Sequence, residues 1–248
     1  LCLVKASQEK CIISSAILAY CMNRGFGCIP STEKAAKLAD GVIANLKGSK
    51  DPLSDFAAGL LLGFGIGKDC SIASAIKLFS STEQKKFWLG NVYLAALLLK
   101  QTSHQDLSRS FTLTEAAANL NIVDAVGLLG YLYETGNGVQ QDLREAVRNY
   151  KKAADCNHSM SLNNLGALYE NGRGVEVDIH LARRYYERSA ALGNPFGMFN
   201  FAAIHHYGKG VPVNLNLAHR IYMQAGNQRS HAGALANLGL MYEFGDGV

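Results

Sequence analysis

Two glycines separated by a single residue recur along this chain at a nearly constant interval, and no other feature constrains the fold as strongly. The four clear pairs are Gly136/Gly138, Gly172/Gly174, Gly208/Gly210 and Gly245/Gly247, and their second glycines follow one another after 36, 36 and 37 residues. A period of about 20 to 50 residues is the signature of stacked structural units. Such stacks present long surfaces that bind other molecules, so the interval favours a binding function over catalysis.

Other residue types recur in the same frame, and each has a physical reason. Small residues stand six positions before the first glycine, at Gly130, Gly166, Ala202 and Gly239, and would let two helices approach closely. Tyrosines stand twelve positions after the second glycine, at Tyr150, Tyr186 and Tyr222, and would fill the space beside those helices. Residues that cap helix N-termini form a third series, namely Ser31, Ser71, Asp106, Asp142, Asp178 and Asn214.

The frame extends backwards into less regular repeats. Glycine pairs occur at Gly25/Gly27 and Gly65/Gly67, whereas Lys100 and Thr102 occupy the glycine positions of the repeat between Gly67 and Gly136. Asp106 keeps the capping position there, so we expect this repeat to form its helix pair as well. The chain is therefore expected to be a single repeat domain over 1–248, with clear repeats in 123–248 and degenerate repeats in 8–122.

Each unit is expected to form a helix, a short glycine turn and a second helix, because apolar residues recur at helical spacing. The expected first helices are 8–24, 53–64, 88–100, 123–135, 159–171, 196–207 and 231–244. The expected second helices are 31–45, 71–83, 106–119, 142–155, 178–192 and 214–225. We therefore predict an all-α solenoid of about six and a half antiparallel helix pairs.

The repeat resembles a known family. The residues that carry the resemblance are Leu165-Gly166, Tyr169, Gly172, Gly174-Val175, Asp178, Ala182, Tyr185-Tyr186 and Ala190, which resemble the Sel-one-like repeat (SLR), a tetratricopeptide-like α/α solenoid. The resemblance implies a right-handed superhelix and a scaffold or adaptor role in protein complexes. It also implies that the first helices line the concave face.

Composition and charge exclude several other classes. The chain has 248 residues and a net charge of only +4, with no basic stripe interleaved with aromatic residues, so we expect no nucleic-acid partner. No apolar run reaches the length of a membrane-spanning helix, so we expect no membrane insertion. The six cysteines do not recur with the repeat, which favours free thiols. The compartment stays open: the cytoplasm is slightly favoured, and a sequon at Asn157 keeps a secretory location possible.

The ends of the sequence suggest a fragment of a longer protein, because the last repeat stops after its glycine turn. We expect the last helix to lack its partner. Its apolar residues Leu238, Met241 and Tyr242 should then be partly exposed or covered by a neighbouring molecule.

No motif indicates an enzyme, a cofactor or a metal site. Ser-x-x-Lys occurs at Ser7, Ser31 and Ser74 without its companion motifs, and Gly63-Phe-Gly65-Ile-Gly67-Lys68 lacks the spacing of a phosphate loop. His205 and His206 are adjacent and point in different directions on a helix, so they are unsuited to hold one metal ion together. We expect His205 to lie in the core with a hydrogen bond and His206 to face the groove.

The candidate partner-binding residues lie on the expected first helices. An asparagine precedes the Leu-Gly position at Asn164, Asn200 and Asn237, and its amide could hold the backbone of an extended or helical segment. The remaining candidates form an apolar floor and a mainly acidic edge: Tyr131, Ala167, Leu240, Glu134, Glu170, His206 and Glu243. These carboxylates would favour a basic segment. The asparagines could instead bond between neighbouring helices of the solenoid itself.

We therefore predict a protein–protein interaction scaffold. One alternative is a regulatory subunit of an enzyme or complex whose active part lies elsewhere. Another is a structural spacer between other domains.

Overall fold

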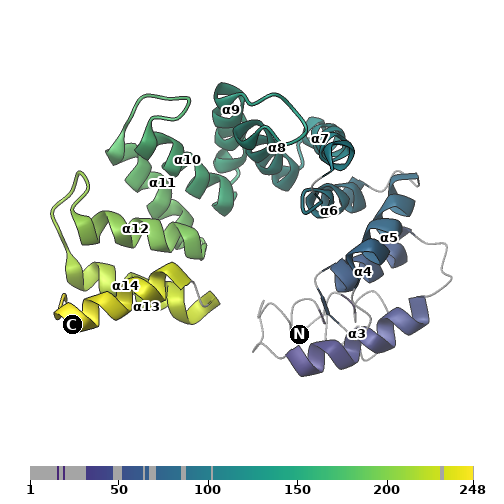
Figure 1. Ribbon diagram of the computed structural model, residues 1–248, viewed down its shortest axis with the longest axis horizontal. Coiled ribbons are helices and arrows are strands. Elements are labelled where there is room, and N and C mark those ends of the chain that lie inside the picture. The colour runs from purple at the N-terminus through teal and green to yellow at the C-terminus, as the bar shows by residue number, and fades with distance from the viewer. Residues whose placement is uncertain are drawn as a thin grey trace. The chain divides into compact units, whose positions relative to one another are not determined.

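The computed structural model describes residues 16, 19, 32–46, 52–63, 65–66, 71–84, 88–101, 103–229 and 232–247. These residues form twelve α-helices and no β-strand, which confirms the predicted all-α fold (Figure 1). The first expected helix, 8–24, lies outside the described residues apart from positions 16 and 19. The chain divides into two compact units, Leu1–Ala117 and Ala118–Val248.

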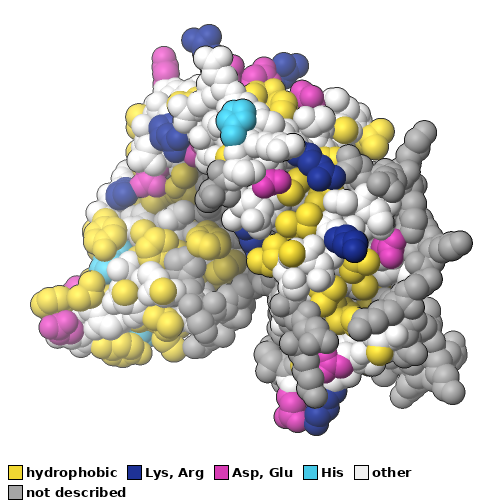
Figure 2. All heavy atoms as spheres, turned by 45° about the vertical axis from the view of Figure 1, so that its right-hand side comes forward, with side chains coloured by type: hydrophobic (Ala, Val, Ile, Leu, Met, Phe, Trp, Pro, Cys, Tyr) yellow, Lys and Arg dark blue, Asp and Glu magenta, His cyan; other side chains and the backbone are white. Residues whose placement is uncertain are grey.

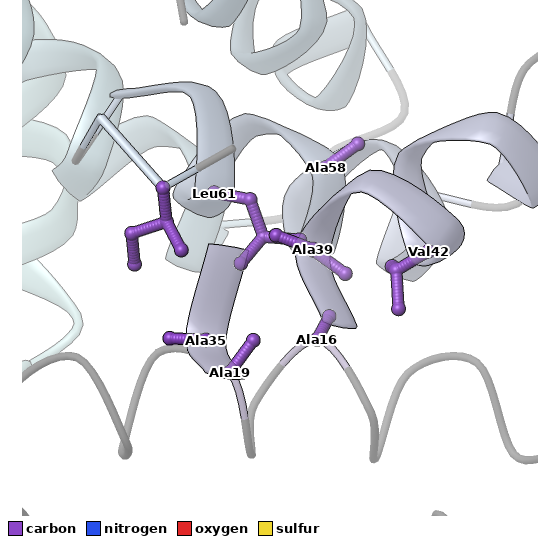
Figure 3. Packing of buried hydrophobic residues seen from close by; sticks show 9 residues of the cluster. Ala16, Ala19, Ala35, Ala39, Val42, Ala58 and Leu61 are labelled. Carbon is purple, nitrogen blue, oxygen red and sulfur yellow. The ribbon is translucent and has the colours of Figure 1, made fainter. Parts of the chain in front are cut away.

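The first unit contains the degenerate repeats. Its helices are α3 (Thr32–Leu46), α4 (Pro52–Gly63), α5 (Ile72–Gln84), α6 (Trp88–Leu98) and most of α7 (His104–Asn119). Buried residues of α3 and α4 form one apolar cluster, which includes Ala39, Val42 and Leu61 (Figure 3). Small residues dominate this cluster, because short side chains allow helices to pack closely.

The repeat without glycines forms its helix pair, as predicted. The buried Ser110 hydroxyl of α7 donates to the Ala95 carbonyl of α6 at 2.9 Å. The predicted cap at Asp106 is wrong, however, because α7 begins two residues earlier and Ser103 is its N-cap. The Ser103 hydroxyl accepts from the Asp106 backbone N–H at 3.1 Å and donates to the Asp106 carboxylate at 2.5 Å. Asp106 is therefore the third helical residue, and its backbone N–H is the donor that the Ser103 cap satisfies.

The second unit contains the clear repeats. Its helices are α8 (Val123–Thr135), α9 (Leu143–Asp155), α10 (Ser159–Asn171), α11 (Ile179–Ala191), α12 (Pro195–Tyr207), α13 (Leu215–Arg229) and α14 (Ala232–Phe244). The helices of each repeat pack together as α8/α9, α10/α11 and α12/α13, and the first helices also contact one another, α8 with α10 and α10 with α12. The first helices thus form a continuous layer within this unit.

The other predicted caps of the second helices hold where the structure describes them. Asp142 accepts from the backbone N–H groups of Arg144 and Glu145, at 2.9 and 3.1 Å. The remaining bonds to a cap side chain join Ser74 to Ser71, Leu181 to Asp178 and Leu217 to Asn214. Ser31 lies outside the described residues.

The two glycines of each turn have different reasons to be glycine. Gly172 ends α10 in the left-handed region, with φ +65°, which is costly for other residues. Gly174 is also left-handed, with φ +73°, and a methyl carbon there would lie 2.7 Å from the Leu143 carbonyl oxygen. Leu143 belongs to the preceding repeat, and Gly247 meets Leu215 in the same way. The second glycine therefore allows consecutive repeats to stack.

Tyrosines of the second helices form the centre of each repeat. Tyr150 and Tyr186 are 1% exposed and Tyr222 is fully buried. A methyl carbon at Gly130 or Gly166 would lie 2.7 Å from the ring of Tyr150 or Tyr186, respectively. The small residues at Gly130 and Gly166 thus leave room for the tyrosine rings that pack against them.

The last helix differs from the expectation of a partly bare apolar face. Leu238 is 5% exposed and Met241 is fully buried, because both pack in the apolar cluster formed with α12 and α13. The prediction was wrong for these two residues. It was right for Tyr242, which is 58% exposed.

Candidate functional site

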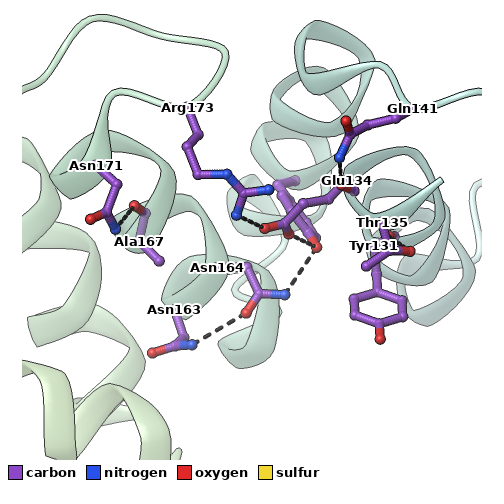
Figure 4. Close-up of polar contacts among 10 residues, drawn as sticks. Tyr131, Glu134, Thr135, Gln141, Asn163, Asn164, Ala167, Asn171 and Arg173 are labelled. Atoms are coloured by element: carbon purple, nitrogen blue, oxygen red, sulfur yellow. Dashed lines mark hydrogen bonds and ion pairs between the residues drawn. The ribbon is translucent and has the colours of Figure 1, made fainter.

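A polar network joins the glutamate of one repeat to the next repeat. The Tyr150 hydroxyl of α9 donates to Oε2 of Glu134 on α8 at 2.8 Å (Figure 4). Arg173, which stands between the glycines of the following repeat, donates to Oε1 of Glu134 at 2.7 Å. The Asn164 amide, also from the following repeat, donates to the Tyr150 hydroxyl at 3.0 Å. The network therefore locks two consecutive repeats together.

Most of the network recurs one repeat later. The Tyr186 hydroxyl donates to Glu170 at 2.8 Å, and Lys209 donates to the other oxygen of the same carboxylate at 2.6 Å. Asn200 departs from the pattern, since its amide donates to Oδ1 of Asn163 at 2.9 Å.

The tyrosine hydroxyls remain protonated donors in this environment. Burial, and then the adjacent Glu134 or Glu170 carboxylate, raise the pKa values of Tyr150 and Tyr186 far above the ordinary value. Burial also raises the pKa of Tyr222 to about 12. The Tyr150 and Tyr186 hydroxyls can therefore donate to Glu134 and Glu170 throughout the physiological pH range.

The third junction of the unit lacks the glutamate–cation pair of the other two. His206 stands at the position of Glu134 and Glu170, and Asp246 stands at the position of Arg173 and Lys209. The His206 ring stacks on Tyr207 with centroids 4.5 Å apart, and its Nδ1 is buried without a hydrogen-bond partner. Asn237 keeps the role of Asn164, because its amide donates to the Tyr222 hydroxyl at 2.8 Å.

These contacts bear on the asparagines and the acidic edge that were predicted to bind a partner. Asn164, Asn200 and Asn237 all donate to neighbouring helices. These are the bonds expected if the asparagines hold the helices of the solenoid together. Glu134 and Glu170 have side chains only 17% exposed and ion-paired, whereas Glu243 is exposed. That these residues also bind a partner stays a prediction.

His205 was expected to have a hydrogen bond, and that expectation was wrong. Both ring nitrogens are buried without a hydrogen-bond partner, and the ring meets Phe201 edge-on with centroids 5.0 Å apart. Burial, and then the nearby Arg183, lower the pKa of His205. The ring therefore acts as a neutral packing element.

Exposed apolar side chains lie along one side of the first helices. Two predicted residues belong here, Tyr131 and Leu240, which are 41% and 47% exposed, while the predicted Ala167 is half-buried. We name the following set the first-helix surface: Tyr131 of α8, Met160 and Ala167 of α10, Phe196, Ala203 and Tyr207 of α12, and Leu240 of α14. Residues spaced by four, seven or eleven positions share one side of a helix.

Met160, Phe196 and Tyr207 were missed from the sequence. The sequence argument relied on residue types shared between repeats. These three residues stand at positions that Asp124 or Thr135 occupies in α8, so the residue type is not shared. Helical spacing from Ala167 and Ala203 could have found them. Yellow hydrophobic side chains are visible on the C-terminal part of the chain, at the left of Figure 2.

One side-chain cluster resembles a catalytic triad without the access that catalysis needs. Nδ1 of His158 lies 2.7 Å from the Ser161 hydroxyl, and Nε2 lies 3.5 Å from Asp124. Ser161 is only 1% exposed, so a substrate could not reach its hydroxyl. His158 instead caps α10, because its Nδ1 accepts from the Ser161 backbone N–H at 3.3 Å.

Within the described ranges, His, Cys, Asp and Glu side chains form no cluster of three or more that could hold a metal ion. Among the same residues, no helix has both the length and the apolar character needed to cross a membrane.

Stacked helix pairs with a glycine turn and inter-repeat contacts define a tetratricopeptide-like α/α solenoid. The Sel1 repeat model matches more than half of the chain, at residues 14–40, 123–158, 159–194, 195–230 and 232–248, so the chain belongs to the Sel1 repeat family. Proteins of this family are generally scaffolds for protein–protein interaction and are typically non-catalytic. The model leaves 41–122 unmatched, although α4 to α7 form helix pairs there.

Solved structures support the fold. A Sel1 repeat protein from Oxalobacter formigenes is 21% identical with a TM-score of 0.67, and the match covers 99% of this chain and 70% of that one. A protective antigen with an SLR fold from uropathogenic Escherichia coli is 21% identical with a TM-score of 0.62, covering 98% and 51%. An immunity protein from Pseudomonas aeruginosa is 15% identical with a TM-score of 0.60, covering 89% and 83%. No curated protein sequence matches this chain significantly.

Proposed function

We propose that this chain is a non-catalytic scaffold that binds another protein through the first-helix surface of its second unit. The observation that carries the proposal is the group of exposed apolar side chains on neighbouring first helices. Phe196 and Tyr207 are 50% and 58% exposed on one helix, with the small residue Ala203 between them. Aromatic residues are enriched in protein interfaces, because they bury a large area with few rotatable bonds.

The frame beneath this surface supports a binding role. The Glu134 and Glu170 networks tie consecutive repeats together, so the first helices are held in place before a partner arrives. A preorganised surface binds more tightly, because less conformational entropy is lost on association. These first helices are also the ones that the family resemblance implies would line a concave face.

The test is partner capture followed by direct affinity measurement. Proteins retained by the wild-type chain would be identified by mass spectrometry and compared with those retained by a Phe196→Ala, Tyr207→Ala double variant. We expect at least one purified partner to bind the double variant about tenfold or more weakly, as at interface hot spots. Leu192→Ala is the matched control, because Leu192 is 48% exposed at the end of α11, outside the first-helix surface.

Equal binding by all three proteins would contradict the proposal. Retention of no partner would instead favour the structural-spacer alternative. Measuring the partner affinity and the melting temperature of an Asn200→Ala variant would separate a binding role of the amide from its contact with Asn163.

A further inference from the structure

One side of α14 is exposed, although the same side is covered in the other first helices of its unit. We name the residues on this side the α14 pairing face: Gly239, Tyr242 and Glu243. The residues at the same positions of α10 are Gly166, Tyr169 and Glu170, and none of them is exposed. Tyr242, by contrast, is 58% exposed. The described part of the chain therefore leaves the α14 pairing face largely uncovered.

In α10 the corresponding side is covered by two adjacent tyrosines of α11. A methyl carbon at Gly166 would lie 2.7 Å from the Tyr186 ring, and the Tyr186 hydroxyl donates to Glu170 at 2.8 Å. The Tyr185 ring stacks on Tyr169, with centroids 5.7 Å apart. Second helices place a ring against the same position of α4 and α8 as well, in the pairs Phe79/Gly59 and Tyr150/Gly130. This side of a first helix is therefore shaped to receive an aromatic ring.

The described residues supply no such ring to α14. A methyl carbon at Gly239 would meet nothing within 4 Å. The Tyr242 ring meets only the edge of His219 of α13, with centroids 5.3 Å apart. Glu243 forms no hydrogen bond or ion pair with any residue that the structure describes. The α14 pairing face thus keeps the space and the acceptor that hold a tyrosine in the preceding repeats.

The charges on and beside this face indicate a basic occupant. Glu243 and Asp246 are both acidic, and residues 232–248 contain no lysine or arginine. Arg220 is the one Lys or Arg among the described side chains of α13, which packs against α14, and it forms no ion pair with either carboxylate. A second copy of this face would be equally acidic. Electrostatic complementarity therefore favours a basic segment of a different protein over a second copy.

We propose that the α14 pairing face binds a basic helical segment of another protein that carries two adjacent aromatic residues, the second of them a tyrosine. The tyrosine ring lies against Gly239 and its hydroxyl donates to Glu243, while the other ring stacks on Tyr242. This inference goes beyond the function proposed above, because it involves neither Phe196 nor Tyr207.

The test offers the helix that covers α10 to the α14 pairing face of a separate molecule. The probe is a labelled synthetic peptide of residues 178–192, made helical by a covalent link between positions 180 and 187, which are exposed in the intact chain. The linked peptide keeps three arginines against one aspartate. Fluorescence anisotropy with the full 248-residue chain measures its affinity, which should fall as salt is added.

Variants on both sides test the placement of the tyrosine. Gly239→Leu fills the space for the ring and should weaken binding about tenfold or more. The space beside Gly239 is open, so this substitution should leave the fold intact. Glu243→Gln in the chain and Tyr186→Phe in the peptide should each weaken binding about tenfold. Together they should weaken it no more than either alone, because both remove the same hydrogen bond.

The Phe196→Ala, Tyr207→Ala double variant separates this inference from the function proposed above. It should bind the peptide as tightly as the wild-type chain does. Loss of peptide binding in the double variant would place the peptide on the first-helix surface and overturn the inference, while leaving the scaffold function in place. No binding to the wild-type chain, or equal binding to Gly239→Leu, would also overturn it. Light scattering that shows a dimer dispersed by Gly239→Leu would make a second copy the occupant instead.

Discussion

The Tyr186 hydroxyl donates to the Glu170 carboxylate across the two helices of one repeat, and the two oxygens lie 2.8 Å apart. Lys209 of the next repeat binds the other oxygen of that carboxylate at 2.6 Å. One glutamate therefore holds together its own repeat and the repeat that follows. A solenoid needs such contacts, because its stability depends on the interfaces between neighbouring units.

Tyr186→Phe should destabilise the chain by removing this donor while keeping the packed ring. A hydrogen bond to a charged group contributes about 1.5–3 kcal/mol, so we expect a loss of about that size in the free energy of unfolding. Urea unfolding measures it. Tyr207→Phe is the control, since Tyr207 is 58% exposed, and should change the stability little. Equal effects of both substitutions would contradict a structural role for the Tyr186–Glu170 bond.

Gly166 and Gly239 stand at the same position of their repeats, but replacement by alanine should change the stability in opposite directions. Gly166→Ala places a methyl carbon 2.7 Å from the buried Tyr186 ring, and overpacking costs about 1–3 kcal/mol. Gly239→Ala meets nothing within 4 Å and gains about 1 kcal/mol of helix propensity. We expect the melting temperature to fall for Gly166→Ala and to rise for Gly239→Ala. A rise in both would show that the tyrosine ring moves aside at little cost.

His158 should make the stability of the second unit depend on pH. Burial lowers the pKa of His158 below its ordinary value, and the nearby Asp124 only partly opposes this. A histidine with a lowered pKa in the folded state contributes stability above about pH 6.5, and that stability is lost as the pH falls below this value. Protonation also prevents Nδ1 from accepting the helix-capping bond from Ser161.

His158→Asn is the variant that isolates this effect. Asn194 caps α12 at the equivalent position, so asparagine should preserve the cap without titrating. We expect the difference in stability between about pH 7.5 and about pH 5.5, roughly one unit on either side of the ordinary histidine pKa, to be smaller in the variant. Unfolding by urea at both pH values measures the difference. An unchanged pH dependence would place its origin elsewhere, for example at His205, whose pKa is also lowered.

The third junction, which has His206 and Asp246, can be converted to the pattern of the other two. His206→Glu together with Asp246→Lys places a carboxylate beside Tyr222 and a cation at the position of Lys209. We expect the two substitutions to be favourably coupled by about 0.5–1 kcal/mol, because His206→Glu alone adds a like charge near Asp246. A double-mutant cycle of unfolding free energies gives the coupling. Additive effects would show that the two positions are not in contact.

Much of the fold could be predicted from the sequence, because its determinants are local. The glycine interval, the caps at Asp142, Asp178 and Asn214, and the helical spacing of apolar residues each depend on a few neighbouring residues. Even the glycine-free repeat was placed correctly, although its cap moved from Asp106 to Ser103. Both residue types cap helices well, so local sequence alone did not choose between them.

The contacts between repeats were decided only by the tertiary structure. The sequence showed that Glu134, Tyr150 and Asn164 stand at positions that recur with the repeat. It could not show that they meet one another or Arg173, because Arg173 lies 39 positions from Glu134. Stacking brings these side chains together, pairs Glu134 and Glu170 of the predicted acidic edge with cations, and leaves Phe196 and Tyr207 exposed. Local sequence thus determined the helices and turns of each repeat, whereas packing between repeats determined which side chains remain available to a partner.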